Sequence, residues 1–187
     1  MYSLVQIDKH SFDTTIEHFS FPPFHRIEDM GELTKLSFLP RLRSATFTGT
    51  GLDDRGLLGV CGASTIENLD LQDTKVSNDG LACLARLPNL RHLRLKDNRQ
   101  LTNACIPTIL QLRALVDLQV HETSIDQAGV NQLVTLSNLR DLCVYVEDDN
   151  YSFEELLQLS ARMPRCTILA KGRGEFLGGA FEGTWTR

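Results

Sequence analysis

The sequence predicts an α/β solenoid, a fold in which short units of one strand and one helical turn stack side by side. Leucine accounts for 30 of the 187 residues, and apolar residues return at a nearly constant spacing of 24 residues. Within each period, one apolar set has the spacing of a short strand and a second has that of a helix. One such unit cannot bury its own apolar stripe, whereas stacked units make a continuous core.

A strand pattern opens each period. Its first apolar residue recurs at steps of 24, 24, 25 and 24 residues, at Leu42, Ile66, Leu90, Leu115 and Leu139. The residues three and five positions later are apolar as well, and because they lie two apart they share one face of a strand. These pairs are Ala45/Phe47, Leu69/Leu71, Leu93/Leu95, Leu118/Val120 and Leu142/Val144.

A helical pattern follows each strand. Three apolar residues at steps of three form one stripe of a helix or 3₁₀ turn. The sets are Leu33/Leu36/Leu39, Leu57/Val60/Ala63, Leu81/Leu84/Leu87, Ile106/Ile109/Leu112 and Val130/Leu133/Leu136. Residues that commonly cap helix N-termini precede four of these sets, at Asp53, Ser77, Thr102 and Asp126. Glycine recurs three residues later, at Gly56, Gly80 and Gly129.

One unit carries a family pattern: Leu90-x-x-Leu93-x-Leu95-x-x-Asn98-x-x-Leu101. It resembles the leucine-rich repeat superfamily, in a Thr/Asn variant similar to the cysteine-containing type, because Thr50, Thr74 and Thr123 stand where the family usually has Asn. The resemblance implies a horseshoe or arc, with a parallel sheet on the concave side and short helices on the convex side. It also implies protein binding.

The ends are expected to differ from the central units, because terminal units of a solenoid must shield its core. We expect a single domain over 1–187, with an N-terminal cap over 1–15 and about six to seven repeats over 16–170. Ile16-x-x-Phe19-x-Phe21 fits a first strand, and Ser152 to Glu155 form a capping box that opens a helix. Residues 171–187, rich in glycine and aromatic residues, are expected to form either a cap or a flexible tail.

Composition excludes several function classes. A net charge of −5 and a pI near 5.5 argue against nucleic acid or an anionic membrane as partner. No apolar run approaches the roughly 20 residues of a membrane span. The first residues lack the basic start and apolar core of a signal peptide. With an odd count of five cysteines, these features lead us to expect a reducing, cytoplasmic location.

The strand residues between the apolar ones are expected to face outward in columns. His92, Arg94 and Lys96 make a basic strip, flanked by Asp70 and Asp73 on one side and by Asp117, Glu122 and Asp141 on the other. One interpretation is mutual neutralisation of a solvated face. The other is a docking surface, and the residues expected to contact a protein partner are His92, Arg94, Lys96, Asp117, Gln119, His121, Asp141 and Tyr145.

One group of residues could form a catalytic or metal-binding site. Asp117, His121 and Cys143 fall on neighbouring strands, and such a trio can build a nucleophilic site or most of a zinc site. The three occupy different positions along their repeat units, however, so the pattern does not imply that they meet. No phosphate-loop, dinucleotide or zinc-protease motif is present. The acidic run Glu147-Asp148-Asp149 is interpreted as a solvated loop or, alternatively, an interaction loop.

The sequence therefore predicts a non-catalytic protein–protein interaction module that needs no cofactor or metal and binds a protein partner through the concave sheet. An adaptor or toxin-neutralising role is a special case of this function. Two alternatives stay open: a hydrolase or metal-dependent enzyme using Asp117, His121 and Cys143, and a structural or oligomerising repeat protein.

Overall fold

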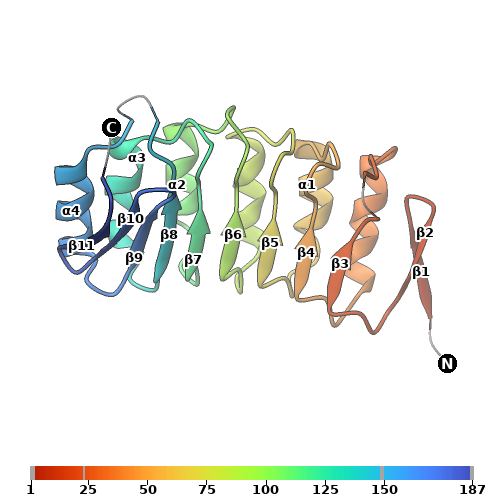
Figure 1. Ribbon diagram of the computed structural model, residues 1–187. Coiled ribbons are helices and arrows are strands. Elements are labelled where there is room, and N and C mark those ends of the chain that lie inside the picture. Colours follow the sequence, from red (N-terminus) through yellow and green to blue (C-terminus); the bar gives the residue numbers. More distant parts are fainter. Residues whose placement is uncertain (1–2, 23, 148–149, 186–187) are drawn as a thin grey trace.

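A computed structural model describes residues 3–22, 24–147 and 150–185, and these residues form a row of stacked units. Figure 1 shows the strands side by side in chain order, with the helices along the opposite face. Within the described residues, no helix is both long and apolar enough to cross a membrane.

Seven parallel strands form most of one nine-stranded sheet, ordered β3 to β11 along the row. They are β3 (His18–Ser20), β4 (Ser44–Thr46), β5 (Asn68–Asp70), β6 (His92–Arg94), β7 (Asp117–Gln119), β8 (Asp141–Val144) and β9 (Thr167–Ala170). Residues one period apart pair directly, as Leu69 does with Leu93 and Leu93 with Leu118. The predicted α/β solenoid, with its parallel sheet, is thereby confirmed.

Short helices and 3₁₀ turns cover the other face. They are η1 (Met30–Phe38), α1 (Asp54–Val60), η2 (Gly80–Arg86), η3 (Asn103–Cys105), α2 (Ile106–Ile109), α3 (Gln127–Val130), η4 (Asn131–Thr135) and α4 (Phe153–Arg162). Both predicted apolar sets are buried between the layers in one continuous core. The helices are short because each must return the chain to the next strand within about 24 residues.

The Thr/Asn column satisfies backbone groups where each strand ends. Thr50, Thr74 and Thr123 each donate a hydroxyl hydrogen bond to the carbonyl three residues before, at 2.7, 3.0 and 2.6 Å. Asn98 does more, because its amide donates to the carbonyls of Leu71 and Leu95 and its Oδ1 accepts from Thr74 N at 3.1 Å. The asparagine therefore joins two units, whereas each of these threonine bonds stays within one.

In the central units, side-chain hydrogen bonds also link the N-terminal ends of helical segments in neighbouring units. Asp54 accepts from the backbone N and hydroxyl of Ser77 at 2.7 and 2.6 Å, and Asn103 Oδ1 accepts from Asp126 N at 3.1 Å. Ser77 and Asp126 therefore cap their own helical segments and also donate these bonds to the preceding unit. A Cβ on Gly80 would lie 1.9 Å from Asp54 Oδ1, and one on Gly129 would lie 2.2 Å from Asn103 Oδ1, which explains the glycine at these two positions.

An antiparallel hairpin of β1 (Leu4–Ile7) and β2 (His10–Asp13) lies at the N-terminal end, outside the main sheet. It packs on the first repeat through aromatic rings, with Phe12 and Phe19 centroids 4.7 Å apart. The buried Asp8 carboxylate bonds His25 Nε2 at 2.8 Å and accepts from Glu28 N at 3.0 Å. The hairpin thus covers the apolar end of the core.

A second hairpin closes the C-terminal end. Strands β10 (Gly174–Leu177) and β11 (Ala180–Gly183) pair with each other, and β10 pairs antiparallel with β9. Phe176 is fully buried against Phe153, Phe181 and Trp185, at ring-centroid distances of 5.4, 4.6 and 5.7 Å. This hairpin extends the sheet face on which the candidate site lies.

Candidate docking surface on the open face of the sheet

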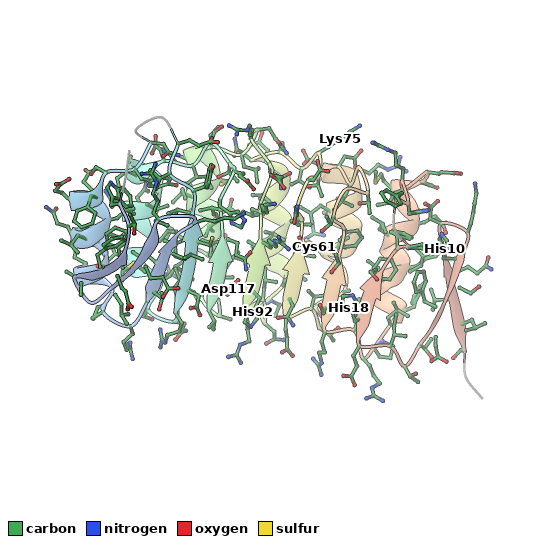
Figure 2. The ribbon with its side chains drawn as sticks, in the orientation of Figure 1. His10, His18, Cys61, Lys75, His92 and Asp117 are labelled. Atoms are coloured by element: carbon green, nitrogen blue, oxygen red, sulfur yellow. The ribbon has the colours of Figure 1, made fainter. Side chains whose placement is uncertain are left out.

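The open face, which we define as the sheet face turned away from the helices, carries most of the residues predicted to bind a partner. Register places His92 beside Asp117 and Asp117 beside Asp141, and it places Arg94 beside Gln119. Figure 2 shows the labelled His92 and Asp117 side by side on neighbouring strands. Three of the predicted residues lie just beyond the strands: Tyr145 directly follows β8, and Lys96 and His121 lie two residues after β6 and β7.

Two of the expected lateral charge pairs form, Arg94 with Asp70 and Lys96 with Glu122. Arg94 Nη1 lies 3.3 Å from Asp70 Oδ2, and Lys96 Nζ lies 2.9 Å from Asp97 Oδ2 and 3.3 Å from Glu122 Oε2. The hydrogen bond to Asp97 is the main cause that raises the pKa of Lys96. The basic strip is therefore held in place by acidic neighbours.

The acidic lip of the face also has a backbone role. Gly49, Asp73, Asp97 and Glu122 occupy equivalent positions and all have positive φ, at 67°, 50°, 58° and 60°. Each is the left-handed residue of the turn that leaves a strand, a conformation that side chains other than glycine adopt at a cost. Part of the acidic pattern thus lies on the repeated turn.

A hollow of about 430 Å³ lies where the open face meets the C-terminal hairpin. It gathers five of the eight predicted contact residues, namely Arg94, Asp117, Gln119, His121 and Asp141. His92 lines a smaller neighbouring hollow of about 310 Å³ together with Arg94 and Asp117. Lys96 and Tyr145 are half-buried and line neither of these hollows.

His121 differs from its expected outward orientation. Its residue is only 4% exposed, and its Nδ1 has no hydrogen-bond partner among the described residues. Burial, followed by the nearby charges of Lys171, Lys96 and Arg94, lowers its pKa to about 4. Strand alternation predicts which face a side chain lies on but not how deeply its neighbours cover it. At neutral pH the ring is an uncharged polar group in the wall of the hollow.

The trio proposed for catalysis lines the same hollow. Burial raises the pKa of the Cys143 thiol to about 11 and also raises that of Asp117. No hydrogen bond joins Cys143 to His121, or His121 to Asp117, in the described part of the chain. A nucleophilic cysteine needs a lowered thiol pKa and a hydrogen-bonded base, and this site has neither.

The described residues show no cluster of side chains suited to bind a metal ion. Across the residues that the structure describes, no three His, Cys, Asp or Glu side chains lie close enough together to hold a metal ion.

Besides Leu142 and Cys143 on β8, four residues of the hollow were missing from the predicted contact set, because the sequence places them near the C-terminal end. They are Thr167, Leu169, Lys171 and Glu175. Leu169 pairs with Cys143 on one side and with Glu175 on the other, so the outward columns continue through β9 into β10. Extending the predicted columns by one more strand would have found Thr167, Leu169 and Lys171.

Two further features lie outside the predicted set. A hollow of about 550 Å³ runs along the loops that lead into the strands, lined by residues such as Glu67, Arg91 and Arg140. In the acidic run after β8, Glu147 pairs with Arg99 at 3.1 Å. Asp148 and Asp149, the rest of that run, fall outside the described residues.

No protein-family model matches the sequence, and no curated protein matches it. Among solved structures, internalin C2 of Listeria monocytogenes matches 77% of this chain and 56% of its own, with a TM-score of 0.57 and 23% identity. An internalin (inlF) of the same organism matches 76% and 44%, with a TM-score of 0.50 and 18% identity. The match thus spans about half the length of these two relatives. Internalins are leucine-rich-repeat proteins, and together with the repeated units described above the match shows that this chain adopts the leucine-rich-repeat fold.

Proposed function

We propose that this protein is a non-catalytic interaction module that binds a protein partner through the open face of its sheet. The observation that carries the proposal is the hollow beside the C-terminal hairpin, where the buried Nδ1 of His121 and Nε of Arg94 have no hydrogen-bond partner among the described residues. Buried polar atoms are nearly always bonded, so a partner that enters the hollow and shifts the side chains covering these two atoms can supply the missing groups. The leucine-rich-repeat fold supports the same function.

Rigid presentation is the proposed mechanism. Hydrogen-bonded strands fix the backbone, while ion pairs such as Asp70–Arg94 and Lys96–Glu122 hold the side chains between them. Little conformational entropy is then lost on binding, which leaves more of the contact energy as affinity.

The carboxylates of the hollow favour a partner with a basic side chain at this position. Asp117, Asp141 and Glu175 line the hollow and form no ion pair among the described residues, whereas Arg94 is already paired with Asp70. Lys171 offsets only one of these three carboxylates. Burial raises the pKa of Asp117, so a cation beside it would stabilise its ionised form. We therefore expect an Arg or Lys side chain to enter the hollow.

Apolar contact surrounds this anchor. Leu169 and Leu177 are 36% and 50% exposed on the strands that border the hollow. A central charged residue with apolar neighbours is typical of an interface hot spot, and arginine is common among such anchors. The partner is thus expected to present a basic side chain beside an apolar one.

The test uses two charge-reversal variants. Asp141→Lys adds a like charge beside the proposed anchor, and Asp79→Lys makes the same change at an exposed position of the opposite face. Proteins from the source cells that remain on immobilised wild type are purified and titrated with wild type and with each variant. We expect Asp141→Lys to weaken binding about tenfold or more, a change of roughly 1.4 kcal/mol. If every retained protein binds the two variants equally, the open face is the wrong surface.

A further inference from the structure

Two cysteine thiols meet on the helical side of the molecule, away from the docking surface. Cys61 follows the end of α1 and Cys83 lies in η2, in neighbouring units, and their Sγ atoms are 2.7 Å apart. Figure 2 labels Cys61 among the central units. A disulfide bond is about 2.0 Å long, so little movement separates the two sulfurs from bonding distance.

The two thiols differ in exposure. Cys61 is 2% exposed, whereas Cys83 is half-buried and reachable from solvent. The geometry thus provides an outer sulfur that a small oxidant can reach and an inner sulfur in contact with it.

The more exposed thiol, Cys83, is also the more acidic of the two. Hydrogen bonding to Cys61 lowers the pKa of the Cys83 thiol despite partial burial, and the positive charge of Arg86 lowers it further, while Asp54 opposes these effects. The same hydrogen bond and burial raise the pKa of Cys61. Burial raises the pKa values of Cys105 and Cys166 to about 11 and about 12, and Cys61 with Cys83 is the only pair of thiols in hydrogen-bond contact among the described residues.

We propose that Cys61 and Cys83 form a redox modification site, at which a hydroperoxide such as hydrogen peroxide converts the two thiols into a reversible disulfide. The Cys83 thiolate attacks one peroxide oxygen, the O–O bond breaks, and hydroxide leaves and is protonated to water. Cys83 is then a sulfenic acid.

In the second step the Cys61 sulfur attacks the Cys83 sulfur. The S–S bond forms, the S–O bond breaks, and the departing hydroxide takes the Cys61 proton to give a second water. Two thiols and one peroxide thus yield one disulfide and two waters. A dithiol reductant restores both thiols by exchange and becomes oxidised in their place.

The consequence is a covalent link between neighbouring units. The disulfide would close a loop of 22 residues, which includes β5, across the helical side. Because it lies on the face opposite the docking surface, it would join the units without occupying the proposed binding residues.

The experiment treats the full chain with hydrogen peroxide, blocks remaining thiols with iodoacetamide and maps peptides by mass spectrometry without reduction. We expect a linked Cys61–Cys83 peptide pair, lighter by two hydrogen atoms than the sum of the free peptides, which dithiothreitol separates. In Cys61→Ser, we expect the sulfenic acid at Cys83 to persist and react with dimedone. Cys105→Ser, which removes a buried thiol outside the pair, is expected to form the same link at an unchanged rate.

The wild-type measurement decides the matter even if a variant fails to fold. Alkylation of both Cys61 and Cys83 after peroxide treatment overturns the proposal. A link that involves any other cysteine, or oxidation of Cys83 to a sulfinic acid with Cys61 still free, overturns it as well.

Discussion

Among the polar residues that line the hollow of the docking surface, His121 is the most deeply buried. Its ring is almost fully covered, and positive charges at Lys171, Lys96 and Arg94 surround it. Both effects disfavour the imidazolium form, so protonation opposes folding at this position. The wall of the hollow is therefore sensitive to acid.

The pH dependence of stability follows from this histidine. Its folded pKa of about 4 lies below the unfolded value of about 6.5, so the unfolded chain binds the proton first as pH falls. Stability is expected to fall between about pH 6.5 and pH 4 because of His121. Comparing urea unfolding at pH 7 and pH 5, we expect wild type to lose about 2 kcal/mol more than His121→Gln.

Equal losses in the two proteins would contradict this prediction. Because each protein is compared with itself at two pH values, any direct effect of the substitution on folding at neutral pH cancels. Carboxylates elsewhere titrate in both proteins and cancel in the same way.

At the scale of single residues, the sequence predicts the face on which a side chain lies, but not how deeply it is buried or which side chains it contacts. Alternation along the strands correctly placed Arg94 and Asp117 on the open face. It could not predict that His121 would be covered, because that depends on the sizes and positions of neighbours from other units. The Cys61–Cys83 contact was missed for a similar reason, since the 24-residue period fixes strand register but not how helical segments of different length align.

At the scale of elements, each of the central units forms hydrogen bonds with backbone groups of its neighbour. Asp54 and Asn103 accept hydrogen bonds from Ser77 and Asp126 in the following unit, and Asn98 donates to the carbonyl of Leu71 in the preceding one. Sequence patterns predicted the strands, the helical turns and the caps, because these depend on local spacing. The hollow was only partly predictable, since its far wall comes from β9 and β10, beyond the clear repeats.

The C-terminal hairpin is expected to be essential for stability. Phe176→Ala removes a fully buried ring that packs on Phe153, Phe181 and Trp185. We expect the free energy of unfolding to fall by about 3–5 kcal/mol, as for other buried phenylalanines. Chemical denaturation monitored by circular dichroism measures it.

A control substitution at the next residue of the same strand distinguishes the loss of buried packing from a general effect of alanine on strand formation. Leu177→Ala alters a half-exposed side chain on the open face of the same strand, and we expect it to cost less than about 1 kcal/mol. Similar losses in the two variants would mean that the hairpin does not cover the core as described.

Over the whole molecule, the stacking of units makes stability depend on nearest neighbours. Strand β6 is bonded on both sides, by β5 and β7, whereas β1 pairs with β2 alone and lies outside the main sheet. In a solenoid, terminal elements can open without disturbing central ones. The proposed docking surface lies toward the opposite end from this hairpin, so opening there should leave the surface intact.

Hydrogen exchange is expected to be graded along the chain for this reason. Amides in residues 3–15 should exchange about tenfold or more faster than those in residues 90–97, as measured by mass spectrometry of the corresponding peptides. Phe12→Ala removes the ring that contacts Phe19 and should speed exchange in the first peptide while leaving the second unchanged. If both peptides instead exchanged at one rate and responded equally to Phe12→Ala, the hairpin and the central units would open as a single cooperative unit. The proposed docking surface would then depend on the N-terminal hairpin, and substitutions there would weaken partner binding from a distance.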